Sequence, residues 1–167
     1  MQEHSRSRPR KRAQALAEMA VMVPFLVIGM TGFLDLGRAL YYQIALTNAV
    51  REAARYGTQP AYLGINTYCS SGPVPGSTCP VPLDSTICTY VANELTGTGF
   101  TVSCGPDIQV SPRQDIRVSA FNGASGEYRG PVTVSGAYKF TFITPLIGSL
   151  FGGSIIIQSA ATMRAGY

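Results

Sequence analysis

Residues able to act as nucleophiles, bases or metal ligands are few in this sequence. The only histidine, His4, lies in a basic N-terminal tail. A Ser-His or Cys-His nucleophilic pair needs an imidazole beside its nucleophile, and no phosphate-binding or dinucleotide-binding glycine motif occurs. The carboxylates after the N-terminal third belong to no motif: Asp84, Glu94, Asp107, Asp115 and Glu127. We therefore expect a protein that is not an enzyme and that holds neither cofactor nor metal.

The four cysteines suit disulfide chemistry better than metal binding. They are separated by nine, eight and fifteen residues, whereas structural zinc sites usually contain close cysteine pairs. An even number of cysteines in an exported segment indicates disulfides, and four cysteines allow three connectivities. We favour Cys69–Cys79 within a loop, and Cys88–Cys104 joining a helix to a strand.

The net positive charge of the chain is confined to the N-terminus. Residues 1–12 carry all of the net charge of +4, and the eight basic and eight acidic side chains of residues 13–167 balance. A basic run directly before an apolar segment is typical of the cytoplasmic flank that sets membrane orientation. Nucleic-acid binding is the alternative, but no second basic patch interleaved with aromatic residues supports it. We expect a cytoplasmic N-terminus and no nucleic-acid partner, with the orientation set by Arg8, Arg10, Lys11 and Arg12.

An apolar helix should follow this tail. Residues 19–34 hold no charge, and small or apolar residues at 13–17 lengthen the run toward the roughly 20 residues that cross a bilayer. Pro24 should kink the helix. Beyond it an apolar stripe recurs at three- and four-residue spacing, as in an amphipathic helix: Ala39, Tyr42, Leu46, Val50, Ala53 and Gly57. We expect one helix over about 13–55, its first half in lipid and its second half carrying a domain.

A cleaved secretory signal peptide is the alternative interpretation of this segment. It is disfavoured because no A-x-A site is evident and because the helical pattern continues past Asp35. Two opposite-charge pairs lie one turn apart on the predicted helix, Asp35 with Arg38 and Glu52 with Arg55. Such pairs are usually ordinary surface ion pairs.

The rest of the chain favours an α+β head. Residues 58–83 are rich in proline and glycine and should form a loop. A helix capped by Asp84 or Ser85 should run to about Leu95. Strands are expected near 108–110, 116–120, 132–142 and 154–163, the last central or covered because it is apolar on both faces. Residues 144–153 should form an apolar loop that folds onto the head, or touches the bilayer or a partner. A long transmembrane and stalk helix packed on this antiparallel sheet would give an α+β fold.

The N-terminal segment resembles a known family. The pieces that carry the resemblance are QALAE, the apolar run with Pro24, DLGR at 35–38 and ALTNAVREAARYG at 45–57; YKFTFITPLIG and SAATM near the C-terminus match more weakly. They resemble TadE-like proteins, minor pseudopilins of the tight-adherence (Tad/Flp, type IVc) pilus system. The resemblance covers about a third of the chain strongly.

The resemblance implies processing and a register role near the start of the helix. In pilin-like families a prepilin peptidase removes the basic leader, and the fifth mature residue is usually glutamate. A cut between Ala13 and Gln14 would make Glu18 that residue, with Ala13 where glycine is usual. Glu18 would then pair with the N-terminal amine of a neighbouring subunit. The plainer alternative is that Glu18 reaches cytoplasmic water beside Arg12.

The expected organisation is a basic leader (1–13), a transmembrane and stalk helix (14–57), a disulfide loop (58–83) and an exported head (84–167). The resemblance implies a membrane-anchored minor pseudopilin that helps to initiate or assemble a Tad-type pilus. Its partners would be other pilin-like subunits, the inner-membrane assembly platform, a prepilin peptidase and membrane lipid. An accessory single-pass subunit of another membrane complex is the alternative.

Overall fold

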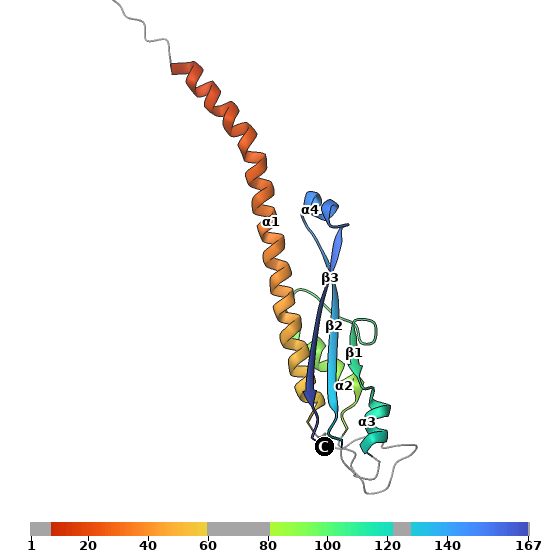
Figure 1. The fold of residues 1–167 in the computed structure, drawn as a ribbon. Helices are drawn as coiled ribbons and strands as arrows, with labels where there is room; N and C mark the ends of the chain where they lie inside the picture. Colours follow the sequence, from red (N-terminus) through yellow and green to blue (C-terminus); the bar gives the residue numbers. More distant parts are fainter. Residues whose placement is uncertain (1–7, 60–80, 122–127, 167) are drawn as a thin grey trace, which may run out of the picture. The chain divides into compact units, whose positions relative to one another are not determined.

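A computed structural model describes residues 8–59, 81–121 and 128–166. The elements follow the order α1 (Arg8–Gly57), α2 (Asp84–Glu94), β1 (Ile108–Ser111), α3 (Gln114–Phe121), β2 (Pro131–Thr141), α4 (Pro145–Leu150) and β3 (Ser154–Arg164) (Figure 1). The described strands form one sheet in the order β1-β2-β3. The expected α+β arrangement, a long apolar N-terminal helix packed on an antiparallel sheet, is confirmed.

The chain divides into two compact units. One contains Met1–Arg38 with Thr141–Ile155, and the other contains Ala39–Phe140 with Ile156–Tyr167. The first holds the N-terminal part of α1 together with α4. The second holds the C-terminal part of α1, most of the sheet, α2 and α3.

In the second unit the apolar stripe of α1 packs on the sheet. Leu46, Val50 and Ala53 are completely buried. A Cβ atom on Gly136 of β2 would lie 3.0 Å from Leu46 Cδ1 and 3.1 Å from Val50 Cγ2, so helix and strand approach closely where β2 lacks a side chain. Tyr42 closes one end of this core in contact with three aromatic rings: Phe100, Tyr138 and Phe140. The predicted helical stripe is therefore the face that packs on the sheet.

The sheet is antiparallel with a regular register. Ile108 pairs with Gly136 and Ser111 with Thr133 along β1 and β2. β2 has the predicted alternation, because Val132, Val134 and Phe140 are buried while neighbouring residues are more exposed. Its central position in the sheet explains why both edges of β2 find hydrogen-bonding partners.

Several expected elements differ in the structure. Residues 116–120, predicted as a strand, lie in helix α3. The alternation of Ile116, Val118 and Ala120 is too short to distinguish the repeat of a strand from that of a helix. The start of α3 is also capped by the side chain of Asp84. The loop expected at 144–153 contains helix α4, which begins with a proline at its first position, a placement suited to helix starts.

The strand at 154–163 was expected to be central or covered, which is wrong. β3 lies at an edge of the described sheet, and Ile156 is 67% exposed while Ile157 is buried. The apolar character of both faces of β3 therefore does not reflect burial on both sides within this chain.

Candidate functional site

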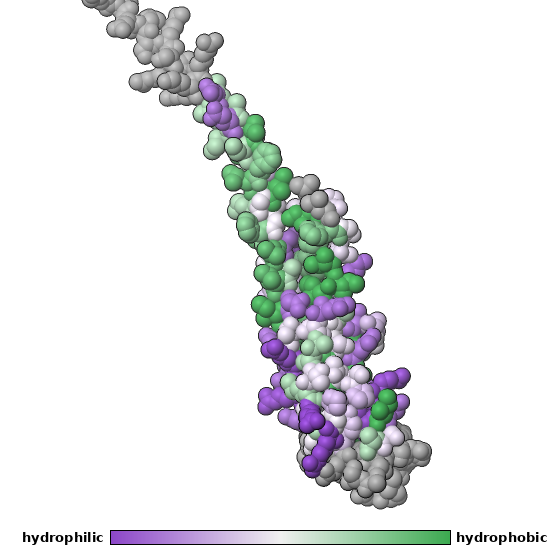
Figure 2. Space-filling model, in the orientation of Figure 1, coloured by the Kyte–Doolittle hydropathy of each residue, from purple (hydrophilic) through white to green (hydrophobic). Residues whose placement is uncertain are grey.

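The N-terminal part of α1 presents an apolar surface that the described part of the chain leaves largely uncovered. Large apolar side chains point outward around the helix, with Leu16, Phe25, Met30 and Phe33 each about 70% exposed. Figure 2 shows this segment as an apolar stretch of the helix. Within the described residues, one helix is long and apolar enough to cross a membrane, at Ala13–Gly57. A helix with apolar side chains on all sides is suited to lipid or to other apolar helices.

The residues expected to govern processing lie on continuous helix. Ala13, Gln14 and Glu18 are exposed, and Gln14 Nε2 donates a hydrogen bond to Glu18 Oε1 at 3.2 Å. Arg8, Arg10, Lys11 and Arg12 lie in the first turns of the same helix, and α1 continues through Pro24. The register and processing roles of these residues stay predictions.

Asp35 has a larger structural role than an ion pair on the helix surface. Its carboxylate is 2% exposed, and it accepts hydrogen bonds from the backbone N–H groups of Ile143 (3.1 Å) and Thr144 (2.9 Å). Arg38 Nη1 donates to the same carboxylate at 3.3 Å, so the predicted pair is present. Asp35 thus holds the segment that leads into α4 against α1, within the first unit.

A close helix contact accompanies this carboxylate. A Cβ atom on Gly32 would lie 2.9 Å from Ile147 Cδ1, so the glycine makes room for the α4 side chain. The link between Asp35 and residues 143–144 was not predicted from the sequence. The available signal was that DLGR and YKFTFITPLIG both resemble the same family, although that resemblance does not show that they touch.

The second predicted ion pair is an ordinary surface pair. Arg55 Nη1 lies 4.0 Å from Glu52 Oε2, and both side chains are more than half exposed. In high dielectric such a pair contributes little to stability.

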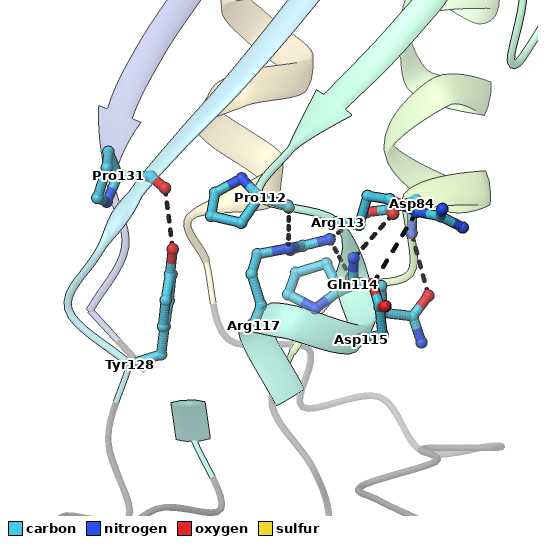
Figure 3. A network of polar contacts seen from close by, with 9 residues as sticks. Asp84, Pro112, Arg113, Gln114, Asp115, Arg117, Tyr128 and Pro131 are labelled. Carbon is cyan, nitrogen blue, oxygen red and sulfur yellow. Dashed lines mark hydrogen bonds and ion pairs between the residues drawn. The ribbon is translucent and has the colours of Figure 1, made fainter. Parts of the chain in front are cut away.

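A buried polar network in the head was not predicted (Figure 3). Arg117 is completely buried, and its guanidinium donates to the Pro112 and Pro82 carbonyl oxygens, both at 3.1 Å, and forms an ion pair with Asp84. The guanidinium is thereby paired and hydrogen-bonded, as a buried charge requires.

The side chains of Asp84 and Gln114 each accept a hydrogen bond from the other residue's backbone N–H, at the start of α2 and of α3. Gln114 N donates to Asp84 Oδ2 at 2.9 Å, and Asp84 N donates to Gln114 Oε1 at 3.4 Å. The first backbone N–H groups of a helix lack partners within it, so each side chain caps the other residue's helix. The expectation that Asp84 or Ser85 would cap α2 itself is wrong, because α2 has Leu83 at its N-cap and no side-chain cap there.

Cys88 of α2 and Cys104 form a disulfide, with Cα atoms 5.8 Å apart. This is the helix-to-strand pairing expected from the sequence, and Cys104 also forms a parallel bridge with Ile108 at the start of β1. The other expected pair, Cys69–Cys79, lies outside the described residues. The disulfide ties α2 to the edge of the sheet.

Together these features define a class of protein: an α+β head joined to one apolar helix of membrane-spanning length. Residues 13–55 match the family model described as TadE-like protein, so the family resemblance inferred from the sequence is confirmed over that segment. The match associates the chain with Tad pilus-related systems. No curated protein and no solved structure matches the chain.

Proposed function

We propose that this protein is a membrane-anchored minor pseudopilin that helps to initiate or assemble a Tad-type pilus. The observation that carries the proposal is the coincidence of two features on α1: the TadE-like match covers residues 13–55, and the N-terminal part of that stretch has large apolar side chains exposed, among them Leu16, Phe25 and Phe33. The role is structural rather than catalytic.

Two features support a topology with the head outside the cytoplasm. The basic residues at 8–12 precede the apolar segment, as in proteins that keep such residues in the cytoplasm. The Cys88–Cys104 disulfide suits an oxidising, extracytoplasmic compartment.

Assembly would proceed by helix bundling. The apolar N-terminal part of α1 exchanges lipid contacts for contacts with the helices of other pilin-like subunits on the assembly platform, while the head selects neighbours. Leader removal between Ala13 and Gln14 by a prepilin peptidase would create an N-terminal amine. Glu18 of an adjacent subunit would pair with that amine, and its exposure on α1 leaves it accessible for this pairing.

Deletion of the gene tests the proposal. We expect surface fibres to be lost or reduced while the level of major pilin is unchanged, and complementation with the wild-type chain should restore them. Complementation with Glu18→Ala should fail, whereas Glu52→Ala, an exposed carboxylate further along the same helix, should succeed. Normal piliation in the deletion strain would contradict the proposal.

Co-purification and N-terminal sequencing separate this role from the alternative of an accessory subunit in another membrane complex. Pilus components in the purified complex and a mature start at Gln14 support the pseudopilin. Components of an unrelated complex and an intact basic tail support the alternative.

A further inference from the structure

We infer that the β2–β3 connection, residues 141–153 with helix α4, is a second membrane contact that lies in the lipid interface beside the anchor helix. The inference rests on the proposed membrane anchoring of α1. It adds a lipid-binding surface formed by residues at least 84 positions beyond Gly57, where that helix ends.

The position of α4 along α1 gives the first argument. α4 and the N-terminal part of α1, up to Arg38, belong to the same compact unit, in which Asp35 accepts hydrogen bonds from the backbone N–H groups of Ile143 and Thr144. Ile147 packs on Gly32, which lies three residues before Asp35 and therefore about 4.5 Å further into the uncharged run at about 1.5 Å per residue. A bilayer that surrounds the uncharged run up to residue 34 therefore reaches α4.

The large exposed side chains of this connection are apolar, and its exposed polar residues, Thr141 and Ser149, are uncharged. Ile143 is 71% exposed and Phe151 is 61% exposed. Residues 140–163 contain no aspartate, glutamate, lysine or arginine, so no charge would have to enter the interface with them. This apolar surface continues directly from that of the anchor helix, which makes lipid the occupant that fits it.

Several backbone N–H groups of the connection already have hydrogen-bond partners within the protein, as a medium with little water requires. Polar backbone groups need internal partners wherever lipid replaces water. Asp35 supplies acceptors for two N–H groups, and three more donate within the connection: Gly148 to Thr144 O (2.9 Å), Phe151 to Ile147 O (3.2 Å) and Gly153 to Gly148 O (2.6 Å). Amphipathic helices that lie in the membrane interface bury their apolar faces about 5–10 Å into the boundary between headgroups and acyl chains, and we place this connection at that depth.

Tryptophan fluorescence offers a direct test, because the chain contains no tryptophan. The full-length Phe151→Trp protein would be reconstituted into phosphatidylcholine vesicles containing lipids brominated either near the headgroup end or near the methyl end of the acyl chain. Phe25→Trp, 69% exposed on the anchor helix, reports on anchoring. Ile116→Trp, 55% exposed on α3, is the control on an exposed apolar residue of the head.

We expect Phe151→Trp to lose fluorescence with the shallow bromines more than with the deep ones, and its emission to shift to the blue relative to Ile116→Trp. Ile143→Trp should behave in the same way, which provides a second reporter if Phe151→Trp folds poorly. Quenching of Phe25→Trp alone, with both connection reporters resembling Ile116→Trp, would overturn the inference and leave the anchor intact. Shielding of the connection reporters from aqueous acrylamide without quenching by brominated lipid would indicate a protein occupant, and would also overturn it. If brominated lipid did not quench Phe25→Trp, the proposed membrane anchoring of α1 would itself be contradicted, and the inference would fall with it.

Discussion

Asp35 accepts the backbone N–H of Thr144 at 2.9 Å across 109 residues of sequence. The carboxylate is nearly inaccessible to solvent, yet it sits at the end of the uncharged run of α1, where a buried charge is costly unless it is compensated. Two backbone donors and Arg38 supply that compensation. The same interaction that neutralises Asp35 fixes the β2–β3 connection to the anchor helix.

Replacing Asp35 should release this connection. Asp35→Ala leaves the N–H groups of Ile143 and Thr144 without their acceptor, at a cost on the order of 2 kcal/mol. This cost raises the equilibrium constant for local opening of the connection about 30-fold, and hydrogen exchange should be faster in proportion. Hydrogen exchange of the 141–153 peptide in detergent micelles measures this. Asp35→Asn, which keeps one acceptor oxygen, should give a smaller increase. Glu52→Ala on the same helix should leave the exchange unchanged, and unaltered protection in Asp35→Ala would show that the carboxylate does not hold the connection.

The Asp84–Arg117 pair should dominate the stability of the region around α3. Asp84→Ala leaves the guanidinium of Arg117 buried without its carboxylate and also removes the cap of Gln114. Because Asp84 is itself partly exposed, we expect a loss of about 2–3 kcal/mol rather than the larger values for fully buried pairs. Asp115→Ala removes the exposed partner of Arg113, 4.0 Å away, and should change stability by less than about 0.5 kcal/mol. Circular dichroism melts measure both; equal losses would contradict the network's role.

Loss of the Cys88–Cys104 disulfide should destabilise the head. The cross-link closes a loop with a sequence separation of 16, for which removal costs about 3 kcal/mol. Denaturant unfolding of a Cys88→Ala/Cys104→Ala variant measures the loss, with Cys69 and Cys79 left in place. If Cys88 and Cys104 instead react with an alkylating agent in the purified, non-reduced wild-type protein, the assigned pairing is wrong.

A side chain at position 136 should separate α1 from the sheet. Gly136→Val would place atoms where Leu46, Val50 and Ile108 already approach to about 3 Å, and overpacking of this kind costs about 1–3 kcal/mol. Gly37→Ala is a matched control, because a Cβ there meets nothing within 4 Å and alanine favours helix by about 0.5–1 kcal/mol. Thermal melts should therefore move in opposite directions for the two variants. A neutral Gly136→Val would imply that the helix and the sheet are less closely packed than described.

Stability should fall in alkaline solution partly through Tyr128. Burial raises the pKa of its phenol, although the charge of Arg117 acts in the opposite direction; the hydroxyl donates to the Pro131 carbonyl oxygen at 2.9 Å. The folded state then holds this proton more tightly than the unfolded state. Its contribution is present at neutral pH and is lost as pH rises above the ordinary tyrosine value of about 10. In Tyr128→Phe the decline in unfolding free energy above that pH should be shallower than in the wild type, and identical slopes would contradict this.

The sequence by itself determined the elements that depend on local periodicity. A helix fixes its own repeat, so the spacing of Tyr42, Leu46 and Val50 was sufficient to predict which face of α1 is buried. The alternation along β2 did the same for the central strand. In the same local way, the uncharged run predicted an apolar helix of membrane-spanning length, and the TadE-like blocks predicted the family match over residues 13–55.

Only the tertiary structure decided which distant groups meet. Nothing near Asp35 in the sequence indicates that its carboxylate binds the backbone of residues 143 and 144, and nothing near Asp84 indicates that it caps the helix beginning at Gln114. That cap also helps residues 114–121 to form α3 rather than the predicted strand. The physical reason is that a hydrogen-bonding group is satisfied by whichever partner the packed chain brings within about 3 Å, and the local pattern records only that a partner is needed.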